Sequence, residues 1–291
     1  MQGLIVENIS NLYKIKLKEK IYTATARGKF KKDEISPVVG DLVELTNINE
    51  EKLEAVIEKI LPRKNYVKRP KVSNITQLVF VLSSKHPKPD LLMLDKQLAF
   101  AELLNIKTII VLNKIDLDDK IEFKSIKKIY ESIGYKVIET QANNGNGVKK
   151  LIKLMNNNIN VFSGNSGVGK STLINAIFDE EKTQEGEISQ KNKRGKNTTT
   201  STKLYEIDKN TYIADTPGFS TFDISEIESK DLYKYFKEFS DQNCKYVGCT
   251  HIKEEECGIK QDVKEGKIDL GRYERFCKLY NELKQVEERK W

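Results

Sequence analysis

The sequence predicts a multidomain protein in which a small β-barrel precedes an α/β domain and a mostly helical region. Residues 1–66 contain several short strands of alternating hydrophobicity, which are typical of a closed barrel of the OB type. Residues 67–221 alternate strand-like and helix-like blocks, a pattern that predicts a mostly parallel sheet with helices on both faces. Residues 222–291 have a charged helical pattern around a cluster of cysteines and one histidine.

The bulk composition limits the classes of protein to consider. A formal net charge of +7 and a pI of about 8.9 favour a polyanionic partner, and residues 1–71 carry 15 Lys+Arg against 10 Asp+Glu. Four cysteines in 291 residues do not indicate a disulfide scaffold. No apolar run approaches the roughly 20 residues of a membrane helix, and the first residues lack the pattern of a signal peptide. We therefore expect a cytoplasmic protein without a membrane partner.

Alternation of apolar and polar residues predicts the strands of the barrel, with glycines and an Asn-rich turn between them. These strands are residues 3–18, 21–27, 38–45 and 53–60. The basic stretch 63–71, which follows Pro62, is predicted to be a linker.

The α/β domain begins with a short apolar run, as expected for a strand that is buried on both faces. The predicted strands are residues 77–82, 108–112, 135–139 and 159–163, and the predicted helices are 91–104, 123–133, 148–155 and 171–178. Residues 203–207 and 211–214 should pair as a hairpin. Near the C-terminus, residues 272–291 place apolar side chains on one helix face, at Tyr273, Phe276, Tyr280 and Leu283.

A glycine-rich loop between the strand at 159–163 and the following helix has the sequence of a phosphate loop. Its backbone N–H groups would cradle phosphate oxygens, while a lysine neutralises the β- and γ-phosphates and a serine reaches Mg²⁺. A chance glycine-rich turn is the alternative. The match of eight residues, 164–171, in a strand–loop–helix setting disfavours it. The predicted nucleotide-binding residues are Gly164, Asn165, Ser166, Gly167, Val168, Gly169, Lys170, Ser171 and Thr172.

A tetrad that can read a guanine base, residues 113–116, follows the strand at 108–112. Asp116 can accept hydrogen bonds from guanine N1–H and the 2-amino group, whereas adenine would leave this carboxylate unpaired at a cost of about 1–3 kcal/mol. Asn113 would bond the base edge, and the stem of Lys114 would cover the ring. In a second loop, the N–H of Ala142 would meet guanine O6. The expected ligands are therefore GTP and GDP.

Two further segments carry the expected switch residues. Asp215 would hold Mg²⁺ through water, and the N–H of Gly218 would meet the γ-phosphate. The next residue is Phe219, which cannot orient water by hydrogen bonding, so intrinsic hydrolysis should be slow. Within the basic segment 191–203, Thr199 is the predicted Mg²⁺ ligand of a loop that GTP orders, with a solvated loop as the alternative.

Three cysteines and a histidine gather within fourteen residues, at Cys244, Cys249, His251 and Cys257. Tetrahedral Zn²⁺ takes such a Cys₃His set, and four protein ligands indicate a structural site. The segment has few apolar residues, so a metal would supply folding energy. Cys277 and His86 are predicted to be a packing residue and a loop residue.

Together these motifs resemble the ribosome small-subunit-dependent GTPase A family over nearly the whole chain. The likeness rests on the order of tetrad, phosphate loop and Asp-Thr-Pro-Gly, on the barrel, and on the Cys-x4-Cys-x-His-x5-Cys spacing. The resemblance implies an OB barrel, a circularly permuted GTPase domain and a zinc domain. It also implies binding to the small (30S) ribosomal subunit and its 16S rRNA late in maturation, with GTP hydrolysis stimulated by that subunit.

The family usually carries a histidine directly before three threonines, which are residues 198–200 in this chain. Here that position is Asn197. Either Asn197 orients water through its amide, or the catalytic group lies elsewhere, for example on the ribosome. The predicted catalytic residues are Lys170, Asn197, Thr199 and Gly218. The predicted rRNA contacts are Arg27, Lys29, Lys31, Lys32, Arg63, Lys64, Lys68 and Arg69.

Two other functions remain open from the sequence. One is a GTPase that acts on another RNA, and the other is a weakly hydrolysing, GTP-gated adaptor, for which Phe219 and Asn197 are the motivating residues. A zinc-dependent nucleic-acid protein with a relic nucleotide site is a more distant alternative. Nothing in the sequence indicates an obligate dimer, and we expect a monomer.

Overall fold

The computed structural model describes residues 1–28, 30, 36–68, 70–117, 122–185, 202–215, 224–239 and 243–289. The chain forms two compact units. Residues 1–78, 148–163 and 171–219 belong to the first, and residues 79–147, 164–170 and 220–291 belong to the second.

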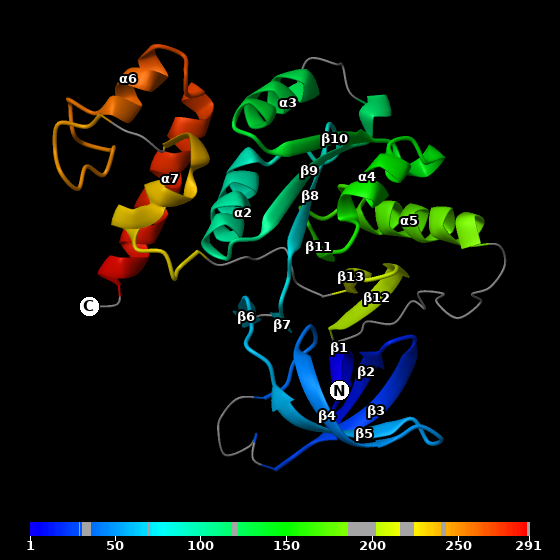
Figure 1. The fold of residues 1–291 in the computed structure, drawn as a ribbon. Coiled ribbons are helices and arrows are strands. Elements are labelled where there is room, and N and C mark those ends of the chain that lie inside the picture. Colours follow the sequence, from blue (N-terminus) through cyan, green and yellow to red (C-terminus); the bar gives the residue numbers. More distant parts are fainter. Residues whose placement is uncertain are drawn as a thin grey trace. The chain divides into compact units, whose positions relative to one another are not determined.

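The first unit begins with a closed five-stranded barrel (Figure 1). Its strands are β1 (Gln2–Ile9), β2 (Leu12–Leu17), β3 (Lys20–Ala26), β4 (Leu42–Asn49) and β5 (Glu54–Ile60). They pair in the order β1-β2-β3-β5-β4, and β4 pairs back with β1. Ile5, Ile15 and Ile57 point inward with no exposed surface. The alternation of the sequence thus yields the predicted barrel.

The predicted linker at 63–71 is in part a hairpin, so this expectation is corrected. β6 (Tyr66–Lys68) and β7 (Lys71–Ser73) pair antiparallel. Arg63 Nε donates to Asp41 Oδ1 at 2.7 Å, and Ser73 Oγ donates to the same oxygen at 2.6 Å. The Asp41 side chain is fully buried, and a buried carboxylate is costly without such partners. These contacts fix the segment to the barrel.

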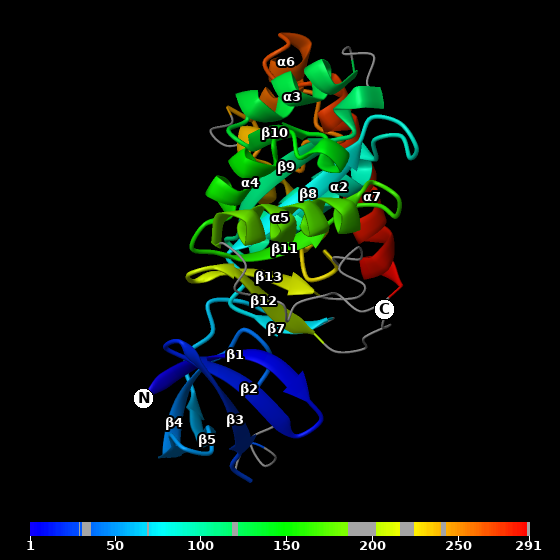
Figure 2. The same ribbon diagram turned by 90° about the vertical axis from the view of Figure 1, so that its right-hand side faces the viewer.

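The rest of the first unit is part of the α/β domain. It contains α4 (Val148–Met155), β11 (Ile159–Ser163), α5 (Lys170–Glu185), β12 (Lys203–Asp208) and β13 (Thr211–Asp215). β12 and β13 form the predicted hairpin, and β11 lies parallel to β13. β12 also pairs with β1 of the barrel (Figure 2). Lys203 of β12 forms an ion pair with Glu7 of β1. Strand pairing therefore joins the barrel to this part of the α/β domain.

The second unit contains the three-stranded order β10-β9-β8, with β9 and β10 parallel. Its strands and helices are β8 (Gln77–Ser83), α2 (Leu91–Leu103), β9 (Lys107–Asn113), α3 (Glu122–Ser132) and β10 (Lys136–Thr140). Every residue of β8 is buried, as its apolar sequence predicts. Side chains of the strands and both helices form one core, which includes Phe80, Leu98, Ile110, Phe123 and Tyr130.

The C-terminal region belongs to the same unit. It consists of η3 (Ser229–Tyr235), η4 (Lys237–Phe239), α6 (Gly258–Lys264) and α7 (Leu270–Glu288). On the predicted face of α7, Phe276, Tyr280 and Leu283 are buried and Tyr273 is half-buried. α7 packs against α2 and η3. Within the described part of the chain, no helix is both long and apolar enough to cross a membrane.

Candidate nucleotide and metal sites

The glycines of the phosphate loop allow it to pack directly on neighbouring groups. Gly164 has φ +129°, and an added Cβ would lie 2.2 Å from the carbonyl oxygen of Val81 in β8. Gly169 has φ +96°, and its Cβ would lie 2.4 Å from Asn113 Nδ2. Side chains at these two positions would push the loop away from β8 and from the tetrad, so the site requires glycine there.

Asn113 links the base-side loops to the phosphate loop. Its side chain is buried at the end of β9, and Nδ2 donates to the carbonyl oxygen of Val168 at 2.9 Å. Its Oδ1 accepts from Thr140 Oγ1 at 3.0 Å and from the N–H of Ala142 at 3.3 Å. The sequence predicted Asn113 at the base edge and missed this linking role, because the partners lie 27 to 55 residues away.

Two lysines are also bound to the phosphate loop. Lys114 Nζ donates to the carbonyl oxygens of Gly167 at 2.6 Å and His86 at 2.8 Å. Lys170 Nζ donates to Gly164 and Asn165 at 2.6 and 2.7 Å. Burial lowers the pKa of Lys170. The structure thus brings the tetrad and the loop together through backbone carbonyls that fix both lysines.

The last tetrad residue, Asp116, lies exposed in the one-turn helix η1 (Ile115–Leu117), which follows β9. Ser171 and Thr172 lie in the first turn of α5. Asp215 ends β13, and its side chain is outside the described residues. Several other predicted residues are also outside them, and their roles stay predictions: Asn197, Thr199, Gly218, Phe219, Lys29, Lys31, Lys32 and Arg69.

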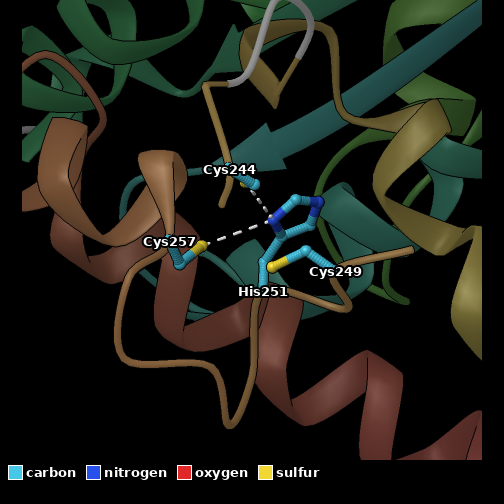
Figure 3. Close-up of side chains that lie close together, drawn as sticks. All are labelled: Cys244, Cys249, His251 and Cys257. Carbon is cyan, nitrogen blue, oxygen red and sulfur yellow. Dashed lines mark hydrogen bonds between the residues drawn. The ribbon is translucent and has the colours of Figure 1, made fainter. Parts of the chain in front are cut away.

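The predicted metal ligands converge on one point (Figure 3). One ligand atom from each of Cys244, Cys249, His251 and Cys257 lies within 4.8 Å of the others. His251 Nδ1 is 3.5 Å from Cys244 Sγ and 3.4 Å from Cys257 Sγ. Tetrahedral Zn²⁺ with ordinary Zn–S and Zn–N bonds would place these atoms about 3.6 Å apart. The geometry therefore fits zinc.

The electrostatics of the cluster also fit a cation. Burial raises the pKa of Cys249 to about 12, so its thiolate needs a positive charge nearby. Burial lowers the pKa of His251, which favours the neutral imidazole that binds metals. The three cysteines are not in disulfides.

A carboxylate that sequence reasoning missed shapes the loop around His251. Glu254 accepts from the N–H groups of Thr250, Ile252 and Lys253 and from the Thr250 hydroxyl, at 2.9 to 3.1 Å. Desolvation acts to raise the pKa of Glu254, but these hydrogen bonds lower it to about 2. His251 has φ +64°, and Tyr273 Oη donates to its carbonyl oxygen at 2.8 Å. In the sequence, nothing distinguishes Glu254 from Glu255 and Glu256.

Comparisons with known proteins agree with this architecture. A model of the RsgA GTPase family matches residues 60–225, and a model of the RsgA N-terminal domain matches residues 2–57. A protein of Caldanaerobacter subterraneus named small ribosomal subunit biogenesis GTPase RsgA is 38% identical and covers 100% of this chain and 98% of its own. A protein of the same name from Clostridium acetobutylicum is 42% identical, over 97% of this chain and 98% of its own.

Two solved structures share the fold. YjeQ from Thermotoga maritima has a TM-score of 0.84 and 35% identity, and the match covers 97% of this chain and 98% of that one. YloQ, described as a circularly permuted GTPase, has a TM-score of 0.82 and 29% identity, and the match covers 98% of this chain and 95% of that one.

A closed barrel, a nucleotide domain whose base tetrad precedes its phosphate loop, and a Cys₃His region define a circularly permuted GTPase. The chain belongs to the RsgA GTPase family, and it is therefore a GTP-hydrolysing enzyme. Use of a guanine nucleotide and Mg²⁺ follows from this membership.

Proposed function

We propose that this GTPase acts in the cytoplasm as a monomer, binds the small ribosomal subunit late in its maturation, and hydrolyses GTP faster when bound. The observation that carries the proposal is the tetrad fixed to the phosphate loop through Asn113 and Lys114. It occurs in a chain whose full-length relatives are named small ribosomal subunit biogenesis GTPases.

In this proposal the loop residues 164–172 hold the phosphates, and Asn113, Lys114, Asp116 and Ala142 read the guanine. Ser171, Thr199 and Asp215 serve Mg²⁺, while Gly218 meets the γ-phosphate. Asn197 orients water, or a group on the ribosome does so. Cys244, Cys249, His251 and Cys257 hold one structural Zn²⁺, which organises the C-terminal region and takes no part in the hydrolysis.

Small ribosomal subunits are expected to raise the rate of GTP hydrolysis at least tenfold over the intrinsic rate, because Phe219 leaves the free enzyme without a water-orienting glutamine. Multiple-turnover phosphate release is measured with small subunits, large subunits and tRNA. Equal rates with all three would reject the small subunit as the partner.

Asn197→Ala tests the water-orienting role, and an unchanged subunit-stimulated rate would place that role elsewhere.

The exposed lysines after the barrel support contact with rRNA phosphates. Lys64 and Lys68 are both exposed, whereas the Arg63 guanidinium is engaged with buried Asp41. The surface proposed for rRNA therefore rests on the lysines and not on Arg63.

Reversing the charge at both Lys64 and Lys68 (Lys64→Glu with Lys68→Glu) is expected to weaken binding to small subunits. The slope of log affinity against log salt should become shallower by about 1 to 2, because each phosphate contact releases counterions. Cosedimentation at several salt concentrations measures both quantities. The matched control is Lys124→Glu with Lys128→Glu, an equally spaced exposed pair on α3. Identical slopes for the two double variants would reject this placement.

Asp116→Asn is expected to lower affinity for GTP about 100-fold, since two charge-assisted hydrogen bonds to guanine are lost. An asparagine can instead donate to the 2-oxo group of xanthine, so affinity for xanthosine triphosphate should rise. Titration with GTP, ATP and xanthosine triphosphate measures the preference. Asp208→Asn, at an exposed position at the end of β12, provides the same chemical change outside the tetrad. Unchanged selectivity in Asp116→Asn would reject the assignment of the base.

A further inference from the structure

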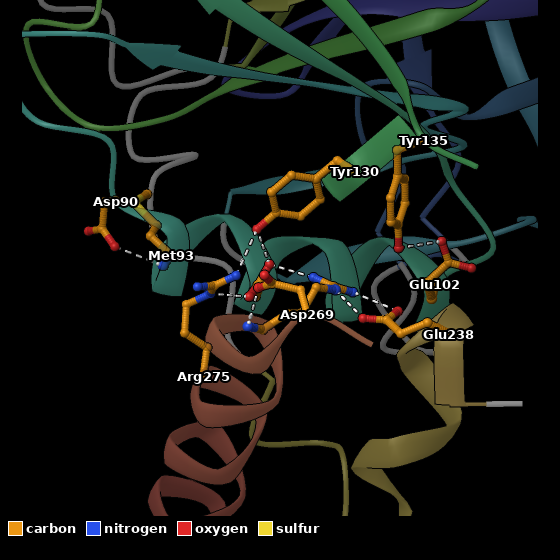
Figure 4. Close-up of polar contacts among 10 residues, drawn as sticks. Asp90, Met93, Glu102, Tyr130, Tyr135, Glu238, Asp269 and Arg275 are labelled. Atoms are coloured by element: carbon orange, nitrogen blue, oxygen red, sulfur yellow. Dashed lines mark hydrogen bonds and ion pairs between the residues drawn. The ribbon is translucent and has the colours of Figure 1, made fainter. Parts of the chain in front are cut away.

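Asp90, the residue directly before α2, contacts the phosphate loop although it lies outside the sequence motifs for nucleotide binding. Asp90 caps α2, and its Oδ1 accepts from the N–H of Met93 at 2.9 Å (Figure 4). Its second oxygen, Oδ2, accepts from Asn165 Nδ2 in the phosphate loop at 3.2 Å. One carboxylate therefore starts a helix and holds the loop at the same time.

Asn165 occupies a sensitive position in the loop. Its carbonyl oxygen accepts from Lys170 Nζ at 2.7 Å, so its peptide group helps to place the phosphate-binding ammonium. Farther along the loop, Asn113 and Lys114 hold the carbonyls of Val168 and Gly167. Asp90 provides a side-chain anchor near the beginning of the loop, where Gly164 and Asn165 meet β8 and α2.

The carboxylate of Asp90 is tolerated near a phosphate site because its charge is compensated. It lies at the N-terminus of α2, where the helix dipole favours a negative charge, and both of its oxygens accept hydrogen bonds. An aspartate also caps α7, where Asp269 Oδ1 accepts from the N–H of Arg272 at 2.8 Å.

Side chains of α2, α3 and α7 make polar contacts with one another (Figure 4). Asp95, in the second turn of α2, is fully buried and forms ion pairs with Arg272 and Arg275 of α7. Tyr130 Oη of α3 donates to the same carboxylate at 2.5 Å. Asp95 lies only five residues beyond the cap, so its contacts with α3 and α7 also restrict the position of Asp90.

We propose that Asp90 is a positioning residue for nucleotide binding, which acts through Asn165 to hold the beginning of the phosphate loop. The proposal rests on the proposed binding of guanine nucleotide by this loop. In this role Asp90 acts through Asn165 and not on the nucleotide itself. It limits the positions available to the Asn165 peptide, and so reduces the ordering that the loop must undergo when phosphate binds.

The test is the dissociation rate of a fluorescent GDP analogue from four proteins: wild type, Asp90→Ser, Asn165→Ala and the double variant. Serine is as good a helix cap as aspartate, so Asp90→Ser keeps the start of α2 and removes the carboxylate that contacts Asn165. Each single variant should release the nucleotide about threefold to tenfold faster, as expected for loss of one hydrogen bond. The double variant should be no faster than either single variant, since both remove the same contact.

Asp269→Ser is the matched control, because it makes the same substitution at the cap of α7, away from the phosphate loop. Its dissociation rate should equal that of wild type, and the thermal melting of Asp90→Ser should be unchanged. Asn165→Ala keeps the proposal testable if Asp90→Ser fails to fold. Rates within about twofold of wild type in Asp90→Ser and Asn165→Ala, or additive effects in the double variant, would overturn the inference. If the wild type itself binds no GDP analogue, the proposed function fails instead.

Discussion

Removal of the proposed zinc ion with a chelator is expected to unfold residues 244–257 while α7 stays folded. This segment has few apolar side chains that could pack together. Its four ligand side chains meet instead, with their ligand atoms within 4.8 Å of one another. Structural zinc in isolated zinc-finger peptides contributes on the order of 10 kcal/mol, more than the local hydrogen bonds of Glu254 can supply. α7 should persist because Arg272 and Arg275 hold it to α2 independently of the metal.

Hydrogen exchange, measured before and after stoichiometric release of the metal, checks this expectation. Amides of 244–257 should lose protection, and those in the middle of α7 should keep it. The fourth cysteine provides a matched control, since Cys277 lies on α7 outside the cluster. Cys249→Ser should abolish stable binding of one zinc equivalent, whereas Cys277→Ser should retain it. Equal zinc content in the two variants would contradict the assigned ligand set.

Arg272→Met is expected to destabilise the contact between α7 and α2 by about 3–5 kcal/mol, the usual cost of breaking a buried ion pair from one side. The Arg272 side chain is 1% exposed and pairs with Asp95 and Glu238, whose side chains are 0% and 10% exposed. A methionine fills similar space but leaves Glu238 unpaired and Asp95 with one arginine fewer. Urea unfolding of the zinc-loaded protein, followed by circular dichroism and hydrogen exchange of α7, measures the loss.

Two variants separate loss of the buried charge from loss of any ion pair. Lys267→Met removes exposed pairs with Asp262 and Glu265 in the same region, and exposed pairs contribute only about 0–1 kcal/mol. In the second, Asp95→Asn is combined with Arg272→Met, which removes a charge on both sides. Its loss of stability should be smaller than the sum of the two single effects. A loss in Arg272→Met no larger than that in Lys267→Met would show that the network does not anchor α7.

Much of the site could be predicted because its chemistry is encoded in short stretches. The eight-residue phosphate loop, the tetrad ending at Asp116 and the fourteen-residue cysteine cluster each fall within one local segment. Where periodicity was regular, boundaries also agreed, as for α4 and β11. The hairpin at 66–73 was missed because a run of basic residues looks like a solvated linker, and only the distant Asp41 shows otherwise.

Short motifs in the sequence predict which groups would bind phosphate, base and metal, since those requirements are met by residue types at short fixed spacing. The contacts that hold these groups in place become visible in the folded structure alone. The side chain of Asp95 lies 177 residues before that of Arg272, and the helical pattern of α7 gives no sign that an arginine is buried there. Likewise, Asp90 reads as an ordinary helix cap until the fold brings Asn165, 75 residues away, within hydrogen-bond distance. Such partners are chosen by packing between distant segments, for which a single sequence carries no local signal.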